Sequence, residues 1–200
     1  MCIRDRFKGT QPTAGDVKYA DLNNDGIIDE RDKKVVSPYS NTPEIMFGLN
    51  LSASWKGFDF SALFQGAANR NVMLGGFATQ MFINGDANLP RYLYEDRWTP
   101  DNRDARYPKA WGPDHPSNNK SSTFWLINGN YVRLKNVELG YSISKDILSR
   151  VGVDRLRIYV GGSNLFSIDH MPGYDPEKQD GGPNYYPQQK VFNMGVNITF

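Results

Sequence analysis

The strongest constraint on the fold is a regular alternation of apolar and polar side chains that begins at Ile45. One set of alternate positions is apolar: Ile45, Phe47, Leu49, Leu51, Ala53 and Trp55. The set between them is small or polar, apart from Met46: Gly48, Asn50, Ser52, Ser54 and Lys56. Because successive side chains of a β-strand point to opposite faces, the pattern predicts a strand with one apolar and one polar face. Its length is about what a tilted strand needs to cross a membrane.

The same alternation returns in four later segments, and a tight turn at Lys56-Gly57 joins the first two strands as a hairpin. The apolar faces of these later strands carry Phe58, Phe60, Ala62 and Phe64; then Val137, Leu139, Tyr141 and Ile143; then Leu156, Ile158 and Val160; and finally Phe192, Met194, Val196, Ile198 and Phe200. We therefore expect an all-β chain of about five antiparallel strands, a twisted meander in which neighbours in sequence pair.

The connections between these strands alternate in length. Lys56-Gly57 and the stretch 144–154 are short, whereas 67–129 and 169–189 are long and polar. Outer-membrane barrels have short periplasmic turns and long extracellular loops, so the chain is predicted to be the C-terminal part of a large transmembrane β-barrel, over 45–200. The segment 7–44 is then expected outside the cell. Because bacterial single-chain barrels have at least 8 strands, further chain is expected upstream.

Composition excludes several other classes. No apolar run is long enough for a transmembrane helix, which is compatible with barrel strands because these are apolar only at every second residue. A net charge of +1 argues against a nucleic-acid partner. The single cysteine, Cys2, rules out a disulfide framework, and neither histidine belongs to a recognisable catalytic motif. The chain is therefore not expected to be an enzyme.

One acidic stretch, DLNNDGIIDERD at 21–32, has the spacing of a calcium-binding loop. Its candidate ligands are Asp21, Asn23, Asp25, Asp29 and Asp32 through side-chain oxygens and Ile27 through its carbonyl. Gly26 stands where such a loop turns sharply, and Asp32 replaces the usual glutamate. The prediction is a structural calcium ion that shapes an extracellular loop. The alternative is an Asx-rich turn without metal.

Several motifs, in this order and spacing, resemble the C-terminal region of the SusC/RagA family of TonB-linked outer-membrane transporters. Besides the acidic stretch they are SWKGFDFSALFQG (54–66), RWTPDN (97–102), YVRLKNVELGYS (131–142), LRIYVGGSNLF (156–166), GYDPE (173–177) and the terminal GVNITF. The resemblance implies a barrel of about 22 strands in the cell outer membrane, in contact with its lipid, with a plug domain and a TonB-contacting segment upstream. It also implies active import of oligosaccharides or peptides with a SusD-like surface lipoprotein as lid.

Two further hypotheses complete these expectations. The residues MCIRDR at 1–6 resemble a translated sequencing adapter, so they are expected to be foreign to the protein. The main rival to the transporter is a secreted, calcium-stabilised β-sandwich that binds carbohydrate. The two differ in what covers the apolar strand faces, because a sandwich buries them in its own core and a barrel presents them to lipid.

Overall fold

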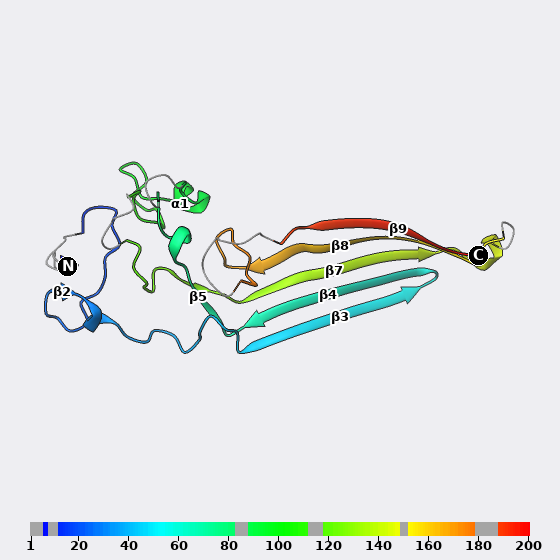
Figure 1. Ribbon diagram of the computed structural model, residues 1–200, viewed down its shortest axis with the longest axis horizontal. Helices are drawn as coiled ribbons and strands as arrows, with labels where there is room; N and C mark the ends of the chain where they lie inside the picture. Colours follow the sequence, from blue (N-terminus) through cyan, green and yellow to red (C-terminus); the bar gives the residue numbers. More distant parts are fainter. Residues whose placement is uncertain (1–5, 8–11, 83–87, 112–117, 149–151, 179–187) are drawn as a thin grey trace.

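A five-stranded antiparallel sheet dominates the computed structural model, which describes residues 6–7, 12–82, 88–111, 118–148, 152–178 and 188–200 (Figure 1). Its strands are β3 (Ile45–Trp55), β4 (Phe58–Ala68), β7 (Tyr131–Ser142), β8 (Arg155–Asp169) and β9 (Val191–Thr199). Their order in the sheet is β3-β4-β7-β8-β9, and every neighbouring pair is antiparallel. The predicted five-stranded meander, with sequence neighbours paired, is confirmed.

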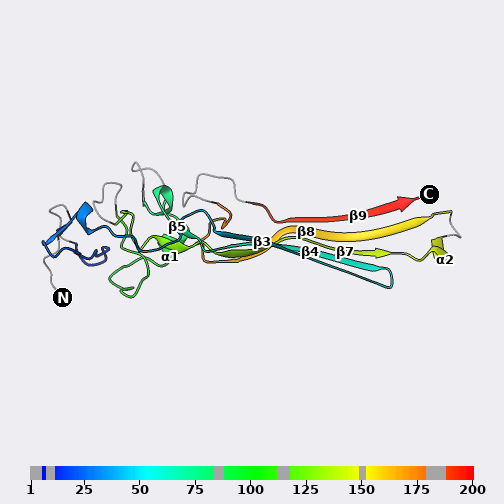
Figure 2. The same ribbon diagram turned by 90° about the horizontal axis from the view of Figure 1, so that it is seen from below.

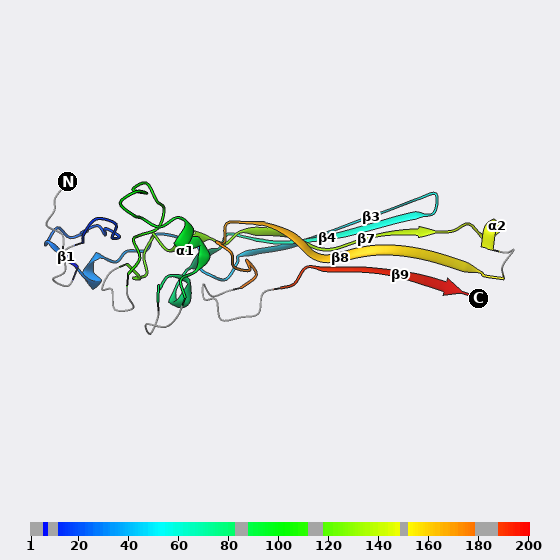
Figure 3. The same ribbon diagram turned by 90° about the horizontal axis from the view of Figure 1, so that it is seen from above.

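The two ends of this sheet differ, as Figures 2 and 3 show. One end, here called the turn end, carries the β3–β4 turn, the short helix α2 (Lys145–Leu148) and the C-terminus. In that turn Lys56 and Gly57 both have positive φ, 48° and 86°, which suits the two-residue turn that joins twisted hairpin strands. The other end, called the loop end, carries the N-terminal segment and the β4–β7 connection. The predicted alternation of short and long connections is therefore present.

The pairing register arranges side chains of one kind in rows across all five strands. Directly paired residues of an antiparallel sheet project to the same face. One such row is apolar: Ala53, Phe60, Leu139, Val160 and Met194. The row beside it is small or polar: Ser52, Ser61, Glu138, Gly161 and Asn193. The sheet therefore has one apolar face and one polar face, as the sequence predicts strand by strand.

A β-bulge in β7 changes which face its first half presents. The register shifts at Lys135, because Leu134 pairs with Phe64 and the next paired residue, Asn136, pairs with Leu63. Arg133 and Glu138 are an odd number of residues apart, so a regular strand would place them on opposite faces. With the extra residue in the bulge, both lie on the polar face. The bulge thus keeps Arg133 off the apolar face.

The loop end has a hydrophobic core of its own, here called the loop core. It contains Val72, Leu74, Ala78, Met81, Leu93, Tyr107, Trp111, Trp125, Ile127 and Met171. Around it lie the β5 (Asn71–Met73) and β6 (Leu126–Asn128) pair, the 3-10 turn η2 (Gly76–Ala78) and helix α1 (Arg91–Glu95). No helix in the described part of the chain has the length and apolar content needed to cross a membrane.

The N-terminal segment adds small elements beyond the loop core. Strand β1 (Arg6–Phe7) pairs in parallel with β2 (Ile27–Ile28), and the 3-10 turn η1 (Glu30–Asp32) follows. Of the predicted adapter residues 1–6, only Arg6 lies within the described residues. A hydrogen bond from the Lys109 N–H to the Gly15 carbonyl, 2.8 Å long, attaches this segment to the β4–β7 connection.

Candidate functional site

Three charged side chains meet on the polar face towards the turn end, one from each of the central strands. Arg157 of β8 donates from Nε to Asp59 Oδ1 of β4 at 3.0 Å and from Nη2 to Glu138 Oε1 of β7 at 2.6 Å. Gly140 lies beneath this contact, and a Cβ built there would be 2.6 Å from Asp59 Oδ1. The triad therefore depends on the missing side chain at Gly140, and it gives the polar face fixed charge that water or a polar solute can reach.

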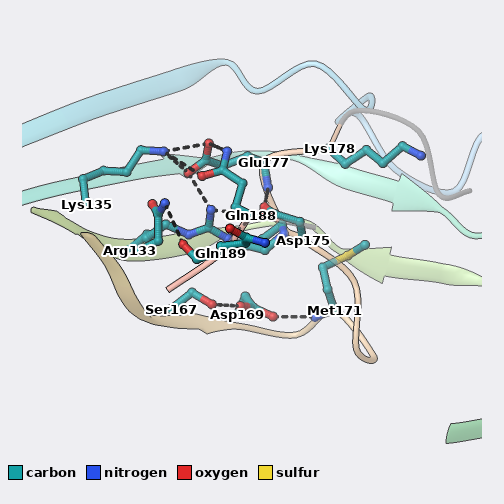
Figure 4. A network of polar contacts seen from close by, with 12 residues as sticks. Arg133, Lys135, Ser167, Asp169, Met171, Asp175, Glu177, Lys178, Gln188 and Gln189 are labelled. Carbon is teal, nitrogen blue, oxygen red and sulfur yellow. Dashed lines mark hydrogen bonds and ion pairs between the residues drawn. The ribbon is translucent and has the colours of Figure 1, made fainter. Parts of the chain in front are cut away.

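A second group of charges holds a short segment against the polar face at the loop end (Figure 4). This segment, here called the strap, runs from the last residue of β8, Asp169, to Lys178. Arg133 forms a two-pronged contact with Asp175, at 2.8 Å from Nη2 to Oδ1 and 3.2 Å from Nη1 to Oδ2. Lys135 Nζ lies 2.8 Å from Glu177 Oε1. The Arg133 and Asp175 side chains are each only 7% exposed, so the pair is largely removed from water.

Arg70 joins the strap to two other parts of the loop end. Its guanidinium donates to the Asn41 carbonyl at 2.7 Å and to the carbonyls of Pro176 and Lys178. The residue is 2% exposed, and burial lowers the pKa of its guanidinium. Three backbone acceptors satisfy this buried cation. Arg70 thereby connects three parts of the chain: the segment just before β3, the end of β4 and the strap.

The strap also reaches the loop core. Met171 is one of the buried core residues, and Tyr174 packs against the core with its ring 5.9 Å from that of Tyr92. Burial raises the pKa of the Tyr92 hydroxyl, which donates to the Ala78 carbonyl. The strap is therefore held on one side by ion pairs to the sheet and on the other by apolar packing.

The predicted calcium ligands lie along one turn, and their oxygens accept backbone N–H groups. Asp21 accepts from Asn24 and Gly26, each at 2.7 Å. Asn23 accepts from the Asp25 N–H, and Asp25 accepts from the Ile27 N–H, both at 2.9 Å.

The second half of the turn closes on itself in the same way. Asp32 accepts from Leu22 with one carboxylate oxygen and from Asp29 with the other, each at 2.8 Å. These backbone hydrogen bonds lower the pKa of Asp32. The compact Asx-rich turn is thus formed by the predicted residues themselves.

A guanidinium stands among these carboxylates. Arg31 Nη2 lies 2.8 Å from Asp25 Oδ2 and 2.9 Å from Asp29 Oδ2. Hydrogen bonds from Arg31 lower the pKa of Asp29, and that of Arg31 is raised in turn. Within the described residues no three His, Cys, Asp or Glu side chains converge as a metal site. A calcium ion would have to compete with Arg31, and calcium binding stays a prediction.

The loop tryptophans serve packing more than recognition. Trp125 is 1% exposed and donates from Nε1 to the Asn118 carbonyl at 2.8 Å, and Trp111 is also buried. The loop aromatics Tyr185 and Tyr186 lie outside the described residues. Neither Arg70 nor the charges of the GYDPE motif stand out in the sequence as functional residues. Their partners lie up to 108 residues away along the chain, and no local pattern indicates such pairing.

No family model matches the chain. Among curated proteins, TonB-dependent receptor P26 of Formosa agariphila is 31% identical over 198 residues, which are 93% of this chain and 20% of that receptor. TonB-dependent receptor SusC of Bacteroides thetaiotaomicron is 27% identical over 185 residues, covering 91% of this chain and 17% of that receptor. The chain thus spans about a fifth of the length of these relatives.

Solved structures agree with the sequence matches. The RagAB peptide transporter superposes with a TM-score of 0.57 and 28% identity, over 81% of this chain and 18% of that one. The RagAB peptide importer in its closed-closed state gives a TM-score of 0.60 and 28% identity, over 82% and 18%. Each relative is named as a receptor, transporter or importer, which supports a role other than catalysis. Sequence and fold agree over most of the chain, which is thus similar to TonB-dependent receptors of the SusC and RagA type, β-barrel proteins of the outer membrane.

Proposed function

We propose that this chain forms part of the wall and outer mouth of an active importer that takes up oligosaccharides or peptides across the outer membrane. The observation that carries the proposal is the two-faced sheet. Leu51 and Val160 on the apolar face remain 46% and 53% exposed, so this face has the character of a surface made for lipid. The polar face, with the Asp59, Glu138 and Arg157 triad, lines the interior.

The rival function, a secreted β-sandwich, is not favoured. A sandwich needs a second sheet about 10 Å away over the apolar face. In the described residues the other sheets are the two-stranded β1–β2 and β5–β6 pairs, which lie at the loop end. Neither is large enough to cover an apolar row that crosses five strands.

The resemblance and the relatives' names guide the proposed partners and substrates. The RagAB structures are named as a peptide transporter and a peptide importer, which supports peptides as one substrate class. Oligosaccharides are the other class that the SusC/RagA resemblance implies. A SusD-like lipoprotein would meet the loop end outside the cell, and the TonB complex would supply energy from the periplasmic side. The segment 7–44 accordingly lies outside the cell in this proposal.

An uptake assay tests this proposal in cells that carry the full-length receptor. Cells with and without the receptor gene would be given fluorescent peptides or oligosaccharides in parallel, and each strain would be paired with a TonB-deficient derivative. We expect uptake of one substrate class that needs both the receptor and TonB. Uptake that persists without TonB would contradict active import, and equal uptake with and without the receptor gene would contradict transport altogether.

We also propose that the turn at 21–32 binds calcium as a structural ion. Support comes from the loop spacing of its oxygens, and competition from Arg31 suggests modest affinity. Calorimetry on the full-length receptor would compare the native chain with Asp25→Ala and Arg31→Gln. We expect heat from the native chain, none from Asp25→Ala and tighter binding by Arg31→Gln. If neither the native chain nor Arg31→Gln released heat on addition of calcium, the proposal would be rejected and the segment would be an Asx-rich turn without metal.

A further inference from the structure

The strap places two carboxylates of the chain itself on two cations of the barrel wall. Arg133 pairs with Gln65 on one side and with Ser167 on the other, so its side chain belongs to the polar face. The strap therefore folds over the interior side of the wall at its outer mouth, where a solute entering the barrel would pass. Lys135, in the bulge, adds a second cation that contacts the same segment.

These cations hold the carboxylates of the strap with a geometry that they could also use for a carboxylate of another molecule. The planar guanidinium of Arg133 meets Asp175 with two parallel hydrogen bonds, the arrangement by which arginine binds any carboxylate. Glu177 is shared, with Oε1 3.0 Å from Arg133 Nη1 and Oε2 3.0 Å from Lys135 Nζ. An acidic group of another molecule could make the same bonds only if the strap moved away.

Because Arg133 and Lys135 are largely buried, the strap can leave them only under certain conditions. The Arg133 side chain is 7% exposed and that of Lys135 is 21% exposed, so departure of the strap would leave two poorly hydrated cations without their carboxylates. A buried charge that loses its partner is strongly destabilising. Release therefore requires another anion in place of Asp175 and Glu177, and it must also give up the Arg70 contacts to two backbone carbonyls of the strap. The strap then acts as an internal competitor for an anionic solute.

We infer that Arg133 and Lys135 form a carboxylate-binding site at the outer mouth, occupied in the resting state by the strap and taken over by a carboxylate of the substrate. The inference rests on the proposed import function. A peptide offers a C-terminal carboxylate, and an acidic oligosaccharide offers uronate groups. The chemistry is the same for both sources, so the experiment has an arm for each.

The test uses the full-length receptor in detergent and two matched pairs of probes. Tetra-alanine with a free C-terminus is compared with its C-terminal amide, and trigalacturonate is compared with neutral maltotriose. Hydrogen–deuterium exchange of residues 171–178 reports whether the strap opens, and anisotropy of a fluorescent derivative reports affinity. We expect at least one carboxylate probe to bind and to speed exchange of the strap, while its neutral counterpart does not. Which probe succeeds identifies the source.

Variants separate competition from a purely structural strap. Asp175→Asn combined with Glu177→Gln keeps the size of the strap side chains but removes their charge, so the carboxylate probe should bind about tenfold more tightly, which is about 1.4 kcal/mol. Arg133→Gln should abolish the preference for the free carboxylate over the amide. The control is Asp101→Asn, an exposed loop carboxylate, which should change neither result.

Two readouts keep the outcome decisive. Two measurements show whether each variant folds: the amount of receptor in the outer membrane, and the difference in migration on an SDS gel between unheated and heated samples. Only folded variants are compared. Equal exchange of the strap with free and amidated peptide, together with equal exchange for trigalacturonate and maltotriose, would overturn the inference. So would unchanged carboxylate affinity in the double variant. If the receptor imports peptides or oligosaccharides in the uptake assay but shows these negative results, the proposed function stands and the strap site alone is rejected.

Discussion

The sheet and the loop core are stabilised by different surroundings, although one chain forms both. On the sheet, Leu139 is 47% exposed and Met194 is 85% exposed, and both belong to an apolar row that crosses all five strands. In the loop core, Leu93 and Val72 are completely buried. The first region leaves its apolar side chains for another medium to cover, and the second covers them with its own side chains.

This difference shows where each region obtains its stability. Lipid replaces a protein core on the apolar face, so the wall needs only backbone pairing and an alternating pattern. The loop end stands in water and must bury its apolar side chains against one another. Substitutions in the two regions should therefore fail in different ways, and variants can separate them.

The largest effect is expected in the loop core for Trp125→Ala. The ring is 1% exposed, stacks on Tyr107 with centroids 6.2 Å apart, and donates to the Asn118 carbonyl. Truncating a buried tryptophan costs about 3–5 kcal/mol. We expect trypsin to cleave the β4–β7 connection in intact cells. The barrel itself should stay folded, as shown by the difference in migration on an SDS gel between unheated and heated samples.

The matched control for that variant is Tyr94→Ala, because Tyr94 lies in the same connection but is 57% exposed. It should leave the trypsin pattern unchanged. If Trp125→Ala also destroyed the heat-resistant barrel, the wall and the loop core would be one cooperative unit, and the contrast between them would fail.

The next effect distinguishes the two faces of the wall by a single step along β3. Leu51 lies on the apolar face near the middle of the strand, and Ser52 lies on the polar face. An arginine on the lipid side near the membrane midplane costs about 2–4 kcal/mol. Leu51→Arg should therefore lower the urea concentration at which the receptor unfolds in lipid vesicles, whereas Ser52→Arg should leave it nearly unchanged. Equal midpoints for the two variants would mean that the faces are assigned wrongly.

The same contrast explains how far sequence reasoning reached. Strand number, order and faces follow from a period of two, which is a local property and was confirmed throughout β3, β4 and β9. The bulge at Lys135 could not be predicted from this alternation. One extra residue interrupts the alternation, and the sequence alone does not distinguish such an interruption from the end of a strand. Arg133 and Lys135 make the first half of β7 polar, and the bulge supplies a structural reason because it places Arg133 on the polar face.

The loop end was predictable only in kind. Its length and polarity indicated an extracellular connection, yet its core joins residues as distant as Val72 and Met171. Such contacts depend on the three-dimensional course of the chain, which no local period encodes. For the same reason Arg70 was missed, since its acceptors are backbone carbonyls that any residue could provide. The acidic turn was recognised by its spacing, but the part played by Arg31 was not.

A smaller effect should separate two glycines on the polar face of the wall. A Cβ at Gly140 would displace Arg157 or Asp59, whereas at Gly48 the nearest atom is the Phe64 carbonyl oxygen at an ordinary 3.8 Å. The displaced atoms are the ends of flexible, partly exposed side chains, so the cost is that of weakened ion pairs and is small. Gly140→Ala should thus lower the unfolding midpoint in urea and Gly48→Ala should not. A tolerated Gly140→Ala would show that the triad can rearrange without loss.

The smallest effect concerns how the N-terminal segment is attached to the loop end. The Asp16 side chain is 4% exposed and contacts Lys109 Nζ at 3.1 Å and Asn118 Nδ2 at 2.9 Å. Burial alone would raise its pKa, but hydrogen bonds from Thr13, Asn118 and Lys109 outweigh it and hold the pKa below 3.8, the ordinary value for aspartate. Because the folded pKa is the lower one, the stability contributed by the Asp16 carboxylate is complete above pH 3.8 and disappears as pH falls through the folded value.

Hydrogen–deuterium exchange of residues 13–19 should accordingly rise in acid, beyond the intrinsic change of exchange with pH. Asp16→Asn should already exchange faster at neutral pH and show a weaker acid response, while Asp101→Asn should behave like the native chain. An acid response as large in Asp16→Asn as in the native chain would assign the effect to other carboxylates, such as Asp29 and Asp32 of the acidic turn, whose pKa values are also lowered.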